Sequence, residues 1–329
     1  MVRRYFLLIL AVTSLVIEVR PQTDWTALWA YQRPALRIAQ EAAPATEPIT
    51  IPVVAVDNDG RPIDNLSKDE VKVFDDGKEQ TMVSFSSGRA QPLSLALLMQ
   101  WSTVREEALP YAELDVIPDF LRSTLNQNDR AFLAIFAEHL NPLTSFTNKL
   151  SEINRGIQEA AQIPQKGSGA LYDALVTVCK DQLGPRSGRK VLVVVAVHEA
   201  RTPTFQLSKN SYPAVVEASL RSGTRIYFLM PEPTDPHFNR QLLRTSFEEA
   251  HRLAVASGGQ ALRARDHSEL IAAFSQFAAE VRSEYLVSYL PEQIDHRDKF
   301  HKIKIETTRR KARLLVAEGY YPTKGQGSQ

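Results

Sequence analysis

The chain has 329 residues, of which 43% are hydrophobic and 23% are charged, and this is an ordinary composition for a globular protein. Its 39 Lys and Arg residues balance 38 Asp and Glu residues. The resulting net charge of +1 does not indicate the basic footprint of a protein that binds nucleic acid or a membrane surface, and we expect neither as a partner. The single cysteine, Cys179, allows no internal disulfide. It lies inside a predicted helix, which favours its interpretation as a small apolar residue over its interpretation as a nucleophile.

Residues 1–20 have the pattern of a targeting segment. Arg3 and Arg4 precede an apolar run at residues 5–17, which suits the core of a signal peptide and is short for a membrane span. No clean cleavage site follows, so a retained short anchor is one alternative and a buried N-terminal helix is another. We expect an exported protein, located in the periplasm, in the cell envelope or outside the cell, whose mature chain begins between residues 17 and 24.

Residues 21–48 are rich in proline and alanine, and we expect a linker there. Residues 49–90 alternate between apolar and polar side chains, which predicts short strands of a small antiparallel β unit. A turn is predicted at residues 57–60 and a tight hairpin turn at residues 75–77. The first turn is not a calcium loop, because alanine and leucine occupy the first and twelfth loop positions. We expect no chemistry in this unit.

Residues 91–290 alternate between apolar strands and helices. The continuous apolar run at residues 93–99 predicts the buried central strand of a parallel sheet. Further strands are predicted at residues 131–136, 190–197, 225–230, 260–263 and 284–290, and helices at 105–125, 150–161, 170–183, 213–221, 239–257 and 268–282, the last capped by Ser268. The alternation predicts the α/β class, with a doubly wound, mostly parallel sheet between helices.

Residues 291–322 return to a period of two and predict a C-terminal β hairpin, followed by a disordered tail at residues 323–329. A small antiparallel unit needs more strands or another layer to bury its apolar face. We therefore expect this hairpin to pack on the β unit of residues 49–90, with the α/β part inserted between them.

Several segments resemble known proteins. Gly-Ser-Gly-Ala-Leu-Tyr-Asp-Ala-Leu at residues 167–175 and Gly-Arg-Lys before a valine-rich strand at 188–197 resemble a von Willebrand factor type A domain. The flanking segments are similar to those of the VWFA-related proteins of acidobacteria; they lie at residues 59–66, 73–80, 280–289 and 319–322. The resemblance covers residues 49–322. It implies a Rossmann-like fold and, at the carboxyl end of the sheet, a metal-ion-dependent adhesion site.

That adhesion site holds a divalent cation through oxygen ligands, including two aspartates. The resemblance places its five positions at Gln100, Ser102, Val104, Gly169 and Val197. Only Ser102 keeps its residue type, and both carboxylates are missing. A hard cation needs several oxygen ligands with negative charge among them. The resemblance therefore implies a degenerate site, and we expect no divalent cation there.

The loops at this edge are still the candidate binding site, because parallel strands all end on the same side. The candidate contact residues are Gln100, Trp101, Ser102, Thr103, Val104, Arg105, Ser168, Gly169, Val197, His198 and Glu199. Trp101 has two interpretations: a ring folded onto the sheet edge, or an exposed aromatic anchor for a partner. His198 is either an ordinary loop histidine or a partner contact.

No other motif predicts a cofactor or a catalytic centre. The turn after the first strand of the α/β part lacks glycine, and no phosphate loop is present, so we expect no nucleotide. Glu248 and His251 have the spacing of a di-iron pair, but such a site needs two motifs, which favours a solvated helix face. We expect a non-enzymatic protein-binding or adhesion-type module, with a protein or an envelope polymer as partner. The alternatives are a scaffold part of an envelope assembly and a metal-dependent adhesion domain.

Overall fold

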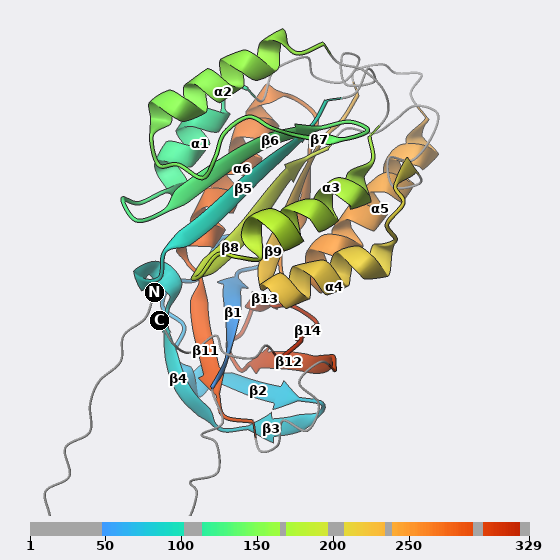
Figure 1. Ribbon diagram of the computed structural model, residues 1–329. Coiled ribbons are helices and arrows are strands. Elements are labelled where there is room, and N and C mark those ends of the chain that lie inside the picture. Colours follow the sequence, from blue (N-terminus) through green and yellow to red (C-terminus); the bar gives the residue numbers. More distant parts are fainter. Residues whose placement is uncertain are drawn as a thin grey trace, which may run out of the picture. The chain divides into compact units, whose positions relative to one another are not determined.

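The computed structural model describes residues 48–101, 114–164, 169–196, 207–233, 239–291 and 299–322 (Figure 1). The chain divides into two units, residues 1–45 and residues 46–329, and every described residue belongs to the second. The predicted targeting segment, almost all of the predicted linker and the predicted tail therefore lie outside the described residues. Among the helices within these ranges, none has the length and apolarity needed to cross a membrane.

A central, mostly parallel sheet has the strand order β10-β9-β8-β5-β6-β7. Its strands are β5 (Leu93–Gln100), β6 (Arg130–Phe136), β7 (Leu140–Pro142), β8 (Arg189–Val195), β9 (Thr224–Pro231) and β10 (Ala261–Ala264). Only the pairing of β6 with β7 is antiparallel. As predicted, the apolar run forms the central strand, and all eight residues of β5 are buried. The order reverses between β5 and β8, so the ligand-binding crevice of a doubly wound sheet is expected at their carboxyl ends.

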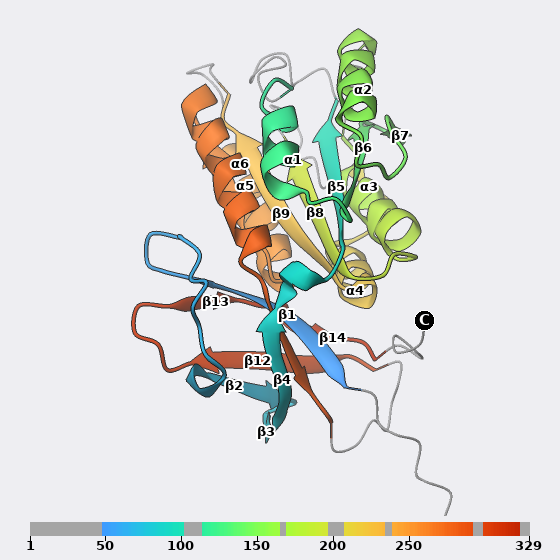
Figure 2. The same ribbon diagram turned by 90° about the vertical axis from the view of Figure 1, so that its left-hand side faces the viewer.

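Helices cover both faces of this sheet (Figure 2). One face carries α1 (Ile117–Thr124), α2 (Leu150–Gln162) and α6 (His267–Arg282), and the other carries α3 (Leu171–Thr177), α4 (Tyr212–Ser222) and α5 (Arg240–Ala256). A π-helical segment, Val178–Leu183, continues α3. Strand side chains alternate between the two apolar clusters under these helices, as the pleat of a sheet requires. The prediction of Ser268 as a cap was wrong: Asp266 caps α6 by accepting from the Glu269 N–H at 2.9 Å.

The remaining strands form two four-stranded antiparallel sheets, ordered β13-β1-β11-β4 and β14-β12-β2-β3. Their bounds are β1 (Ile49–Val56), β2 (Val71–Asp75), β3 (Lys78–Gln80), β4 (Met82–Ser87), β11 (Tyr285–Tyr289), β12 (His301–Thr307), β13 (Arg313–Leu315) and β14 (Gly319–Tyr320). Both sheets contribute apolar side chains to one shared cluster. We call these strands the antiparallel unit. As predicted, N-terminal and C-terminal strands pack together, because β1 pairs with β13 and β2 with β12.

Two sequence predictions about this unit were wrong. The strand predicted at residues 284–290 as part of the parallel sheet is β11, which lies between β1 and β4. All five of its residues are buried, and this mimics the apolar run of a parallel strand. The predicted C-terminal hairpin is also absent, because β12 pairs with β2 and β14 whereas β13 pairs with β1. The chain crosses here from one sheet to the other, which periodicity alone does not reveal.

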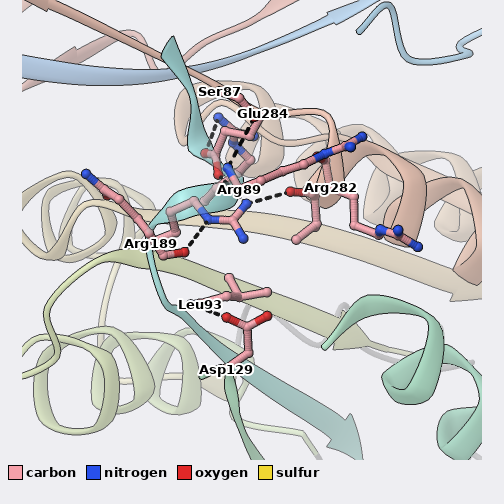
Figure 3. Close-up of polar contacts among 10 residues, drawn as sticks. Ser87, Arg89, Leu93, Asp129, Arg189, Arg282 and Glu284 are labelled. Carbon is pink, nitrogen blue, oxygen red and sulfur yellow. Dashed lines mark hydrogen bonds and ion pairs between the residues drawn. The ribbon is translucent and has the colours of Figure 1, made fainter. Parts of the chain in front are cut away.

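A buried ion cluster joins the antiparallel unit to the amino ends of the parallel strands (Figure 3). Glu284 precedes β11 and lies 3.2 Å from Arg189 Nη1 and 3.1 Å from Arg225 Nη2. The side chains of all three are less than 5% exposed. Arg189 also donates to the Val281 carbonyl at 2.7 Å, and Arg89 donates to the Arg282 carbonyl at 2.6 Å. The cluster fixes the antiparallel unit at one end of the sheet, opposite the carboxyl edge (Figure 1).

Candidate functional site

Of the eleven predicted site residues, the structure describes Gln100, Trp101 and Gly169. The other predicted residues, Ser102, Thr103, Val104, Arg105, Ser168, Val197, His198 and Glu199, lie outside the described residues. Gln100 ends β5 and is 1% exposed, and Gly169 immediately precedes Ala170. The N–H of Trp101 donates to the Phe136 carbonyl at 2.6 Å, and that of Ala170 donates to the Ala137 carbonyl at 2.8 Å. Two of the predicted loops thus meet at the carboxyl end of β6.

Trp101 is 2% exposed and belongs to the apolar cluster beneath α1, α2 and α6. Its indole Nε1 donates to the Ile163 carbonyl at 2.8 Å, which satisfies the ring's polar atom. The interpretation as a ring folded onto the sheet edge is therefore confirmed, and the interpretation as an exposed anchor is wrong.

Two adjoining pockets lie at this edge and share Glu138 and His139, both exposed, in the turn between β6 and β7. The first, of about 420 Å³, is also lined by Leu140, Ala170, Asp173, Ala174, Thr177, Leu207 and Lys209. The second, of about 300 Å³, is also lined by Trp101, Ile135, Phe136, Ala137, Asn141, Ile163 and Pro164. The sequence analysis missed Glu138 and His139, because it did not predict the short antiparallel strand β7 that follows them.

Asp173, one of the two carboxylates that line the first pocket, is already partnered. Burial would raise the pKa of Asp173, but hydrogen bonds from the N–H groups of Lys209 and Asn210 outweigh this effect and hold that pKa below its usual value. Asp173 therefore fixes the loop at residues 207–210 on α3. On the same face of the sheet, burial raises the pKa of Cys179 to about 12, so its thiol is not a nucleophile.

The antiparallel unit contains a second polar cluster, where the sequence analysis expected no chemistry. Asp75 ends β2, and its Oδ2 accepts hydrogen bonds from the phenols of Tyr289 at 2.8 Å and Tyr320 at 2.9 Å. Nδ1 of His301, the first residue of β12, lies 3.6 Å from Asp75 Oδ1 and 3.1 Å from Asp76 Oδ2. Three segments that carry the family resemblance, 73–80, 280–289 and 319–322, each contribute to this cluster. The sequence alone does not show that these three segments converge, because Asp75 lies 214 residues from Tyr289 and 245 residues from Tyr320.

No protein-family model matches the chain, and no curated protein matches it. Solved structures that resemble it include a point mutant of the PilB minor pilin from Streptococcus sanguinis, with a TM-score of 0.46 and 11% identity over 59% of this chain and 62% of that chain. A mutated aerotolerance-related membrane protein from Bacteroides fragilis has a TM-score of 0.39 and 14% identity over 57% and 98% of the two chains. BatB from Bacteroides thetaiotaomicron has a TM-score of 0.41 and 13% identity over 56% and 97%. The chain thus spans less than two thirds of the pilin, and likenesses of this degree carry no functional argument.

Proposed function

We propose that this protein is an exported, non-enzymatic binding module of the von Willebrand factor type A kind, which holds a protein partner at the carboxyl edge of its parallel sheet. The strand order supports the fold assignment: β5 is central, the order reverses beside it, and the edge strand β7 is antiparallel. The export assignment depends on residues 1–20 of the sequence.

One observation carries the binding proposal. The ion cluster of Glu284 attaches the antiparallel unit to the amino ends of the strands. Because the antiparallel unit lies at that end, it does not cover the carboxyl edge. At that edge Glu138 and His139 are exposed between two pockets. Ligands of open α/β sheets bind outside the carboxyl ends of the strands. A partner that inserts side chains into both pockets would contact these two residues.

We further propose that binding here needs no divalent cation. The sequence resemblance aligns Gln100 with the family's first carboxylate, and its side chain is a neutral amide that is 1% exposed. A cation at this position would lack the negative charge that offsets its dehydration.

The test compares two double variants of the full chain. Glu138→Ala with His139→Ala removes the shared wall of the two pockets, whereas Arg155→Ala with Glu159→Ala removes an exposed pair from α2. Partners cross-linked to the wild-type protein in the native envelope fraction are purified, and their affinities are measured. We expect the pocket variant to bind more than tenfold more weakly, about 1.4 kcal/mol, and the α2 variant to bind normally. Equal affinity of a folded pocket variant would refute the proposed contact.

A further inference from the structure

The cluster in the antiparallel unit brings together three side chains with the spacing of metal ligands. Asp75, Asp76 and His301 each offer one ligand atom, and these atoms all lie within 4.8 Å of one another. Asp76 is fixed in the left-handed backbone region at φ 47°, and its Oδ1 accepts from the Lys302 N–H at 2.9 Å. Its other oxygen, Oδ2, is the one that lies toward His301.

The two oxygens of Asp75 have different surroundings. Oδ2 accepts from Tyr289 and Tyr320, whereas Oδ1 is buried and has no hydrogen-bond partner. Asp75 is only 7% exposed, so water does not readily replace the missing partner. Leaving a buried charged acceptor unsatisfied is costly, and such groups call for an explanation. The nearest cation candidate, His301 Nδ1, lies 3.6 Å away, beyond hydrogen-bonding distance.

A metal ion among these atoms would account for this geometry. Two ligands of a tetrahedral Zn²⁺ ion lie about 3.3–3.4 Å apart, given bonds of about 2.0–2.1 Å to nitrogen and oxygen. The distances from His301 Nδ1 to the two carboxylate oxygens, 3.1 and 3.6 Å, fall on either side of that value, and the remaining separation, between the carboxylate ligand atoms, is within 4.8 Å. The ion would also give the buried Oδ1 of Asp75 its missing partner.

The ligand types select among ions. Mg²⁺ and Ca²⁺ prefer sets made of oxygen atoms, whereas a neutral imidazole beside carboxylates suits Zn²⁺. Two carboxylates match the charge of the ion. Outer-shell hydrogen bonds normally orient ligating carboxylates, and the phenols of Tyr289 and Tyr320 are placed to do so for Asp75. The His301 ring is stacked on Tyr320, with ring centroids 5.2 Å apart.

We propose that Asp75, Asp76 and His301 bind a Zn²⁺ ion that ties the hairpin after β2 to the first residue of β12. The ion would link two segments that are 226 residues apart in the chain. With three protein ligands, a fourth position remains for water or for a donor from a partner. This site is independent of the carboxyl edge of the parallel sheet.

The test titrates the full chain, stripped with chelator and dialysed, with zinc chloride in a calorimeter at pH 7.5. We expect one ion per chain and a raised melting temperature, because zinc binds the folded state preferentially. His301→Ala should weaken binding at least 100-fold. Asp76→Asn should weaken zinc binding at least tenfold. The asparagine keeps the oxygen that accepts from the Lys302 N–H, and it tolerates the left-handed backbone. Tyr320→Phe should weaken zinc binding about tenfold through the lost outer-shell bond.

His267→Ala, an exposed histidine at the start of α6, is the control and should bind zinc normally. The proposal is overturned if the stripped protein shows no zinc binding, or if His301→Ala and Asp76→Asn bind zinc like the wild type. Tighter binding of Mg²⁺ or Ca²⁺ than of Zn²⁺ would overturn the choice of ion.

Discussion

The clearest electrostatic prediction concerns Glu280, near the end of α6. This carboxyl group is fully buried, and burial raises its pKa from an ordinary 4.5 to about 7, although Gln276 donates to it at 3.0 Å and Arg225 is nearby. Its Oε1 also accepts from Gln260, whereas Oε2 has no hydrogen-bond partner. The folded protein therefore holds a proton that the unfolded chain releases near pH 4.5.

Proton linkage gives the direction in which the free energy of unfolding changes with pH. Between about pH 4.5 and pH 7 the folded state binds more protons than the unfolded state, so the free energy of unfolding falls as the pH rises. The full effect of such a rise in pKa is roughly 3 kcal/mol, reached above pH 7. Glu280→Gln removes the titrating group and keeps the acceptor for Gln260 and Gln276. The new amide carries two N–H donors at the unpartnered position of Oε2, where protonated Glu280 carries one O–H donor, and the additional unpartnered donor costs on the order of 1 kcal/mol.

We expect the Glu280→Gln variant to be more stable than the wild type by roughly 2 kcal/mol at pH 8 and to lose this advantage by pH 5. Urea denaturation of both proteins at four pH values between 5 and 8 measures the difference directly. Glu159→Gln, at an exposed site on α2, is the control and should shift stability by less than about 0.5 kcal/mol throughout. If the difference between Glu280→Gln and wild type is constant across the range, Glu280 does not titrate there and the reasoning is refuted.

Two further predictions concern the junction between the sheets. Glu284→Ala should lower the free energy of unfolding by about 3–5 kcal/mol in urea denaturation, because it leaves two buried arginines without their carboxylate. The control Glu217→Ala, at an exposed pair, should lower it by less than about 1 kcal/mol. Equal losses would contradict the role of the buried cluster. Gly258→Ala should destabilise the protein more than Gly77→Ala. Both glycines have a positive φ, which costs an alanine about 1–2 kcal/mol, but only at Gly258 would the added Cβ lie 2.6 Å from the Ala317 nitrogen. Similar losses of stability in a thermal melt would count against that close approach.

Local patterns predicted the parallel sheet well. The run at residues 93–99 became the buried centre of the sheet, and the valine-rich run at residues 190–197 became β8. Continuous apolar runs are informative because both faces of such strands are covered. The same rule failed for β11, which is equally buried but lies in an antiparallel sheet. The apolar composition of a strand indicates that the strand is buried, but it does not indicate which strands lie beside it.

The candidate sites were less predictable. The edge of the parallel sheet followed from topology, but Trp101 was open to two interpretations until its burial and its bond to Ile163 were seen. The Asp75 cluster was missed because its members come from four strands and lie in ordinary contexts, such as a hairpin turn. No spacing rule connects Asp75 with Tyr320, which is 245 residues away.

The position of β11 also explains why the antiparallel unit is not an independent appendage. β11 lies between β1 and β4, and its pairing of Tyr289 with Ile49 closes a loop that contains the whole parallel sheet. Loop-closure entropy grows only slowly with length, so the added cost of so long a loop is modest compared with the burial of a central strand. The same closure brings Tyr289 to Asp75. The polar cluster is therefore complete only when β11 has closed this long loop, and an ion bound there would stabilise the closed arrangement.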